Sequence, residues 1–221
     1  MSYDLYLRDP VTREELQVPA HMMFGGNVPC SIQNGQLVPK ATTEAYLNIT
    51  YNYGRYYYEA FPGVDRKTGA VPEGWEEDKK KYSITCDEGG INSLNDLSGL
   101  TAIPLLEEMI RRIEAKYKDE NGEWISTERE NRYVIDKTTG TRKDGVERLD
   151  YYFALRRNGM SDEEAGRLIK ERYEDNTEMI VVNEGETGNY WTATAANAIR
   201  PLYQLIALSR MRPDGVWSEE S

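Results

Sequence analysis

Residues 101–117 read TAIPLLEEMIRRIEAKY, and this stretch decides the fold class. Charged residues separate apolar residues that recur every three or four positions: Ile103, Leu106, Ile110, Ile113 and Tyr117. That spacing predicts an amphipathic helix, which buries its apolar stripe against other elements. Pro104 is compatible with the helix if it lies in the first turn, where its lack of a backbone donor costs nothing.

A second helix is predicted near the end of the chain, over about 190–212. Pro201 lies inside it, so we expect a kink or break near Ala198. Residues 213–215, Pro-Asp-Gly, end the helix, and Trp217 can then fold back onto the core. The apolar residues share one side of this helix: Trp191, Ala195, Ile199, Leu202, Leu205 and Ile206.

The N-terminal part has the pattern of β-hairpins. Residues 3–7 alternate between apolar and polar, and Asp9-Pro10 supplies a turn before Leu16 and Val18. A second hairpin is predicted over 32–38, because Asn-Gly at its centre adopts the positive φ angles of a type I′ turn.

Residues 42–60 fit both a strand and a helix. Alternation covers 47–53, whereas helical spacing covers the whole segment and Thr42 or Thr43 can cap its start, so the pattern favours a helix. Residues 62–90 are rich in Gly, Pro and charge, and we expect mostly loop with a short strand over 82–86.

The stretch 119–189 is more charged and rich in turns. It predicts a β-ribbon over 132–145, a helix over about 146–157, a second helix capped at Ser161, and a buried strand over 179–182. We therefore expect an α+β fold with N-terminal β-hairpins packed with three to five helices. Residues 1–118 plus 190–221 form the core domain, and 119–189 form an inserted α/β-ribbon subdomain.

Composition excludes several kinds of chemistry. The chain has 221 residues, a net charge of -11, one histidine and two cysteines. The acidic surplus argues against direct nucleic-acid binding, and these counts exclude a multi-histidine metal site and a disulfide framework. No leader or membrane-spanning pattern is found, which predicts a cytoplasmic protein without a membrane partner. No motif indicates a cofactor.

Few residues are candidates for catalysis, and none has a supporting pattern. His21 is interpreted as a loop or packing residue, and Cys30 and Cys86 as buried small residues. Gly25-Gly26, Gly89-Gly90 and 185–188 do not match phosphate-binding motifs and indicate turns. One carboxylate pair is the remaining candidate, because Asp87-Glu88 could bind a cation. Glu184 and Glu186 count against an anion at the start of the C-terminal helix.

The densest polar-aromatic cluster is the segment 48–53, NITYNY. On a helix, Asn48 and Asn52 would share a face beside Tyr51 and Tyr53, and their amides could bind a ligand. The alternative is that the amides brace loops while the tyrosines pack. The predicted binding residues are thus Asn48, Tyr51, Asn52 and Tyr53, with no catalytic or metal-binding residue assigned.

Four stretches together resemble a family of small bacteriophage and prophage proteins of no established activity. They are SYDLYLRDPVT at 2–12, TTEAYLNITYNYG at 42–54, GINSLNDLSGLTAIPLLEEMI at 90–110 and YWTATAANAIRPLYQLIALSRMRPDGVW at 190–217. Members of the family are shorter and join the two helices through a brief connection, so the resemblance implies that 119–189 is an insertion. Pro201 departs from the uninterrupted helix of the family.

The resemblance implies a phage or prophage origin and action inside the host cell. We expect a non-enzymatic accessory protein that binds a host or defence protein, such as an inhibitor of a CRISPR effector nuclease. One alternative is a small enzyme or ligand-binding protein with a pocket at Asn48, Tyr51 and Asn52. Another is a virion or assembly component.

Overall fold

The protein is described by a computed structural model, which covers residues 2–23 and 28–220. It has the predicted mixed α+β fold, divided into two compact units. The first unit comprises Met1–Ile125 and Asn183–Ser221, and the second comprises Ser126–Val182. The second unit begins later and ends earlier in the sequence than the predicted insert 119–189.

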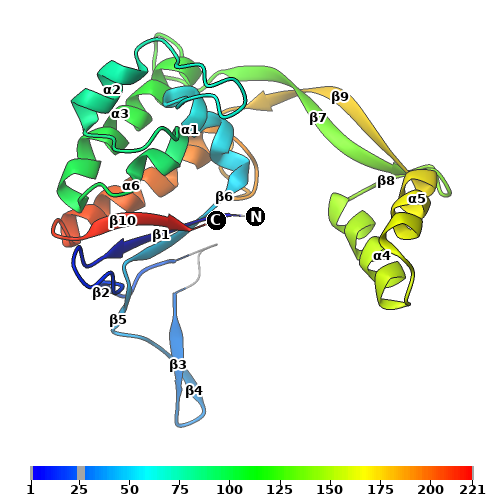
Figure 1. Ribbon diagram of the computed structural model, residues 1–221, viewed down its shortest axis with the longest axis horizontal. Coiled ribbons are helices and arrows are strands. Elements are labelled where there is room, and N and C mark those ends of the chain that lie inside the picture. The colour runs from blue at the N-terminus through cyan, green and yellow to red at the C-terminus, as the bar shows by residue number, and fades with distance from the viewer. Residues whose placement is uncertain (1, 24–27, 221) are drawn as a thin grey trace. The chain divides into compact units, whose positions relative to one another are not determined.

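A three-stranded antiparallel sheet lies at the base of the first unit. Its central strand is β1 (Ser2–Arg8), between β10 (Val216–Glu220) and β6 (Tyr46–Thr50). Alternate residues of β1 are buried beneath the helices, as the polar-apolar alternation predicted. Figure 1 shows the helices of the first unit gathered on one side of this sheet.

The first predicted hairpin is only partly formed. The chain reverses after β1 and pairs again at the Arg8–Glu15 bridge, but β2 (Gln17–Pro19) then pairs with β5 (Thr42–Glu44). The second hairpin is confirmed, with β3 (Cys30–Gln33) antiparallel to β4 (Gln36–Pro39). Asn34 and Gly35 have φ angles of 51° and 77°, as a type I′ turn requires.

The long amphipathic helix is confirmed as α3 (Gly99–Tyr117), and it packs against α6 (Ala195–Met211). The expected position of Pro104 is wrong. Ser98 caps the helix through the Thr101 amide, so α3 begins earlier than expected and Pro104 lies in its second turn. Its side chain is exposed there, so the ring does not disturb the packed face.

The helix α6 also differs from its prediction in two ways. It begins at Ala195 after the Thr194 cap, so Trp191 precedes it and is 60% exposed. No break occurs near Ala198, because α6 continues through Pro201. The hydroxyl of Tyr57 donates to the Ala198 carbonyl at 2.9 Å, next to the Asn197 carbonyl whose intrahelical donor the proline removes. Trp217 is fully buried, as predicted.

The prediction of a helix over 42–60 is wrong for the first half of that segment. Residues up to Thr50 form β5 and β6, followed by the 3₁₀ turn η1 (Tyr51–Tyr53) and α1 (Gly54–Ala60). Pairing with β1 buries Leu47 and Ile49, and this burial outweighs the helical spacing.

The short strand expected over 82–86 is also wrong. That region holds α2 (Trp75–Tyr82), followed by bends and the 3₁₀ turn η2 (Gly90–Leu94). Acidic residues fill the first turn of α2 and lysines its last, which complements the helix dipole. Trp75 and Tyr82 anchor it in the core.

The second unit contains the elements predicted for the insert. Its three-stranded sheet comprises β7 (Ser126–Asp136), β8 (Thr141–Lys143) and β9 (Tyr173–Asn183), although Asn183 itself belongs to the first unit. Its helices are α4 (Gly145–Arg157) and α5 (Asp162–Arg172), and α5 has the expected capping box at Ser161. The strand over 179–182 exists, but the prediction that it is buried is wrong, since Met179 and Val181 are exposed.

Throughout residues 2–23 and 28–220, no helix has the length and apolar character that crossing a membrane requires.

Candidate interaction surface

One face of the first unit's sheet carries polar and aromatic side chains rather than a layer of helices. The strand register places Asp4 beside Asn48, and Tyr6 beside Tyr46. The Tyr6 and Tyr46 rings stack with their centroids 4.5 Å apart, and the Arg8 guanidinium lies 5.1 Å from the Tyr6 centroid. All five side chains are partly exposed. We call Asp4, Tyr6, Arg8, Tyr46 and Asn48 the open sheet face.

Hydrogen bonds hold the open sheet face in one arrangement. Asp4 accepts from the Tyr46 hydroxyl, and its Oδ1 also accepts from Asn48 Nδ2 at 2.7 Å. Burial and this bond to Asp4 raise the pKa of Tyr46, so its hydroxyl stays protonated as a donor. Arg8 Nε is buried with no hydrogen-bond partner among the described residues. The Arg8 guanidinium is paired with Glu220 at 2.5 Å, so the face offers a partner mainly stacked rings and a carboxylate.

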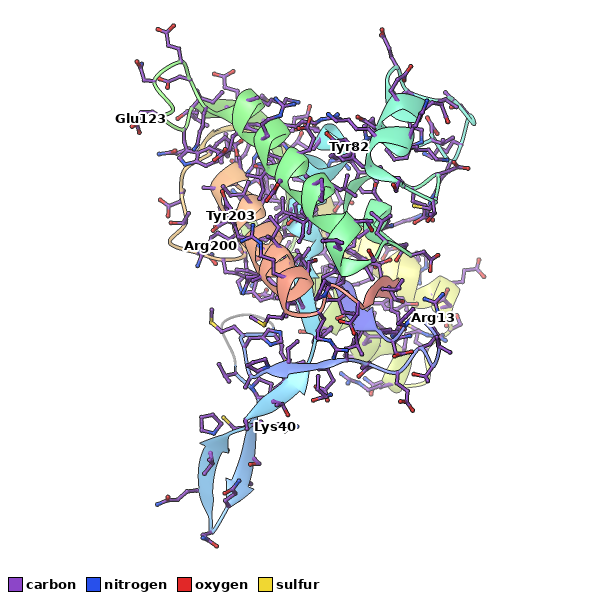
Figure 2. All side chains as sticks on the ribbon, turned by 90° about the vertical axis from the view of Figure 1, so that its left-hand side faces the viewer. Arg13, Lys40, Tyr82, Glu123, Arg200 and Tyr203 are labelled. Atoms are coloured by element: carbon purple, nitrogen blue, oxygen red, sulfur yellow. The ribbon has the colours of Figure 1, made fainter. Side chains whose placement is uncertain are left out.

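The hairpin β3–β4 is an arm beside this face. It forms a two-stranded sheet of its own. Figures 1 and 2 both show it extending from the side of the sheet opposite the helices, with Lys40 at its base in Figure 2. The cross-strand pair Ile32 and Leu37 is 76% exposed at each residue. Isolated hairpins are marginal in water, so this exposed apolar pair indicates a contact surface.

The arm also differs from the rest of the chain in charge. Residues 16–43 contain no acidic residue and a single lysine, Lys40, within a chain of net charge -11. Loss of hydration on binding therefore costs little along this segment, because few charges must leave water. The sequence predicted the hairpin. The absence of acidic residues over 16–43 is a further signal in the sequence that was not used to predict a binding surface.

The four predicted binding residues do not converge. Asn48 lies on the open sheet face, whereas Asn52 donates to the Trp191 carbonyl at 2.9 Å. Tyr53 is fully buried and donates to the Tyr190 carbonyl, and Tyr51 packs edge-on against Tyr3 at 4.3 Å. The side chains of Asn52 and Tyr53 thus brace a loop, which is the alternative that the sequence left open.

These contacts are part of a longer series of hydrogen bonds from side chains to backbone carbonyls of the segment 190–198. The Tyr56 hydroxyl lies 2.8 Å from the Ala193 carbonyl oxygen, and Tyr57 donates to the carbonyl of Ala198. Burial raises the pKa of Tyr53 and of Tyr57, so both hydroxyls remain protonated donors. The tyrosine-rich sequence therefore fixes the point at which the chain returns from the second unit.

The candidate catalytic residues are occupied by structural contacts or lie apart from one another. His21 Nε2 lies 2.8 Å from the Tyr46 carbonyl, and its Nδ1 lies 3.2 Å from the Thr43 hydroxyl, consistent with a packing role. The prediction of buried cysteines is wrong for Cys30, which is exposed on the arm, and Cys86 is intermediate. Burial raises the pKa of Cys86, which disfavours its thiolate.

The Asp87-Glu88 pair lines a cavity of about 570 Å³, together with Asp96. Each carboxylate is opposed by a cation: Asp87 by Lys79 at 2.6 Å, Glu88 by Arg66, and Asp96 by Arg13 at 3.4 Å. These three carboxylates of the lining are therefore neutralised. Within the described ranges, no cluster of three or more His, Cys, Asp or Glu side chains could hold a metal ion.

The start of α6 already holds an anion from the chain itself. Glu184 is fully buried, and its Oε2 accepts from the Ala195 amide at 2.8 Å and from the Tyr56 hydroxyl at 2.6 Å. This carboxylate occupies the place where an external anion would bind. Of the other glycine-rich segments, Gly25-Gly26 lies outside the described residues, and Gly89-Gly90 forms a turn against the Phe61 carbonyl.

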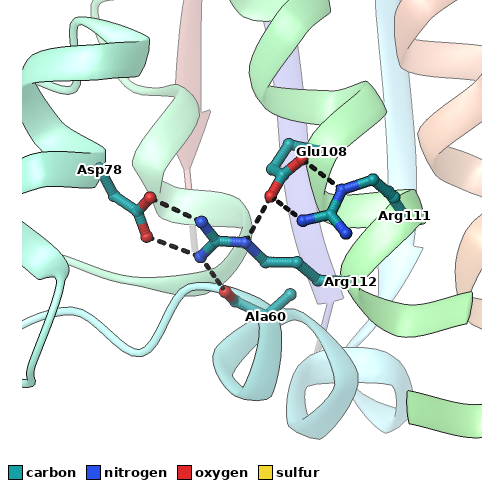
Figure 3. Close-up of polar contacts among 5 residues, drawn as sticks. All are labelled: Ala60, Asp78, Glu108, Arg111 and Arg112. Atoms are coloured by element: carbon teal, nitrogen blue, oxygen red, sulfur yellow. Dashed lines mark hydrogen bonds and ion pairs between the residues drawn. The ribbon is translucent and has the colours of Figure 1, made fainter. Parts of the chain in front are cut away.

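A polar network between α1, α2 and α3 supports the helical layer (Figure 3). Arg112 binds both oxygens of Asp78 at 2.6 Å and donates to the Ala60 carbonyl at 2.9 Å. Glu108 accepts from Arg111 and Arg112, and these bonds lower its pKa to about 2. The network is a structural tie that fixes α2, rather than a reactive site.

The second unit has an open cavity of about 820 Å³ with four basic side chains. Three of them are already paired: Arg142 with Glu178, Lys143 with Glu147, and Arg148 with Asp175. The fourth, Arg132, has no ion-pair partner among the described residues. One spare cation does not make a convincing phosphate site.

No family model, curated protein or solved structure matches the chain.

Proposed function

We propose that the chain is a non-enzymatic, phage-type accessory protein that acts in the host cytoplasm by binding a host or defence protein. The observation that carries the proposal is the arm, an isolated hairpin with an exposed apolar pair in a segment without acidic residues. Such a surface is unfavourable to keep in water and favourable to bury against a partner. The neighbouring open sheet face supplies the polar contacts.

The negative charge of the first unit indicates that the partner has a basic surface. The second unit carries 11 basic and 13 acidic residues, so 9 of the 11 net negative charges lie on the first unit, which also bears the arm. A field of this sign attracts basic protein surfaces, such as those with which nucleases hold nucleic acid. A CRISPR effector nuclease is therefore a specific candidate target.

The test is affinity purification of the tagged chain from infected or defence-proficient cells, coupled to an assay of phage restriction. The variant Ile32→Thr/Leu37→Thr removes the apolar pair and places a β-branched residue at both positions, so the hairpin can persist. The matched control is Gln33→Thr/Gln36→Thr, which changes the adjacent cross-strand pair on the other face of the hairpin.

We expect the wild type and the control to retain one host or defence protein and to reduce restriction. The Ile32→Thr/Leu37→Thr variant should lose both effects. Unchanged restriction together with no specific partner would overturn the proposal. Recovery of the chain from purified particles, without a host partner, would instead identify a virion component.

A further inference from the structure

The helix α4 has an apolar stripe that is more than half exposed. Val146, Leu149 and Phe153 are spaced three and four residues apart and are 59%, 52% and 53% exposed. No residue of α4 is fully buried. Its opposite side is the one that packs within the second unit, where the Tyr151 ring contacts that of Tyr173. The exposed stripe has the spacing with which helices pair.

Two opposite charges flank this stripe on the same side. Asp150 and Arg157 are seven residues apart, so they lie in one line along α4 beside Leu149 and Phe153. Both are exposed, and neither forms a hydrogen bond or ion pair with another described residue. The exposed charges of this unit are otherwise often paired, as with Arg167 and Glu171 at 2.7 Å on α5.

We propose that α4 pairs with α4 of a second copy of this chain, in antiparallel orientation. A two-fold axis midway between residues 153 and 154 brings Asp150 of each helix opposite Arg157 of the other. The same axis brings the two Phe153 side chains together near the centre, with Leu149 of each helix opposite the Asn158 cap of the other and Val146 beyond that end. Parallel pairing places Asp150 opposite Asp150, so the charges select the antiparallel arrangement.

A single pair of short helices makes a small interface, so association is weak and depends on protein concentration. The measurement is sedimentation velocity on the full chain over about a hundredfold range of concentration, at low and high salt. The variants are Asp150→Arg and Arg157→Asp, which each place like charges opposite one another in a homodimer. Both positions are exposed, and circular dichroism checks that the helices remain folded.

We expect each single variant to dimerise at least about tenfold more weakly than the wild type. An equimolar mixture of the two should recover association as a heterodimer, because one chain then carries arginine at both positions and faces aspartate at both positions of the other. Phe153→Ser should abolish dimers, and Arg167→Asp on α5 should leave them unchanged.

A wild-type chain that stays monomeric at every concentration would overturn the proposal. So would dimers that persist in both single variants, or a mixture that shows no recovery. These outcomes do not depend on the arm, so they are distinct from a failure of the proposed function.

Discussion

The two units are stabilised in different ways. In the first unit, aromatic and aliphatic side chains from the sheet and from α1, α3 and α6 form one continuous buried cluster. In the second, the buried apolar residues among those described are few: Val134, Ala165, Tyr173 and Val182. Charged residues make up 24 of its 57 positions. The comparison indicates that burial of a large apolar core stabilises the first unit. The second unit is stabilised more by helix caps, turns and surface ion pairs.

The largest expected effect comes from the centre of the first core. Trp217 is fully buried and donates to the Ser209 hydroxyl at 3.1 Å, so Trp217→Ala should cost about 3–5 kcal/mol of unfolding free energy. Urea denaturation followed by circular dichroism measures it. Tyr173→Ala is the counterpart in the second unit, and hydrogen exchange should show its effect confined to that unit. Loss of protection throughout α3 and α6 would contradict the division.

The second contrast concerns ion pairs. Arg112→Met leaves the mostly buried Asp78 without its cation and leaves Glu108 with Arg111 alone, which should cost about 2–3 kcal/mol. Arg142→Met removes an exposed pair in the second unit and should cost less than about 1 kcal/mol. Equal losses in urea denaturation would show that the surface pairs of the second unit matter more than their exposure indicates.

Acid should weaken the first unit through Glu108. Bonds to Arg111 and Arg112 lower its folded pKa to about 2, from 4.5. A depressed carboxyl pKa contributes stability above about pH 4.5 and loses it as the pH falls towards 2. The variant Glu108→Gln should therefore lose about 1–2 kcal/mol at neutral pH and match the wild type near pH 2. A constant difference across this range would exclude the carboxylate as the cause.

A small and local effect should come from a cap in the second unit. Ser161 accepts from the Glu164 amide, and Glu164 returns a bond to the Ser161 amide. Ser161→Ala should lower the stability of α5 by about 1 kcal/mol, measured as faster hydrogen exchange in residues 162–172. Ser126→Ala, at an exposed position that begins β7, is the control. An effect spread over both units would mean that they unfold together.

Local signals in the sequence predicted the elements that have local causes. The stripe of α3, the Asn-Gly turn of the arm and the Ser161 capping box are each encoded within a few residues, and all three are confirmed. The segment 42–50 was predicted wrongly because its conformation depends on β1, a distant partner. Periodicity within one segment does not contain that information.

The candidate surface was harder to predict for the same reason. Asn48 was found from the sequence, but its neighbours Asp4 and Tyr6 reach it only through strand register. Asn52 and Tyr53 were placed at a binding site because polar-aromatic clusters often bind ligands. Their partners in the folded chain are carbonyls more than a hundred residues away, at Trp191 and Tyr190.

The backbone segments that lead into and out of the second unit are hydrogen-bonded to each other within the first unit. The Glu184 amide donates to the Ile125 carbonyl at 3.0 Å, and Glu184 is itself fixed by the start of α6. A short linker could bridge the two points, and loop-closure entropy favours a shorter loop. The position is thus a natural site for exchange of modules, at which residues 126–182 could be deleted or replaced without rebuilding the core.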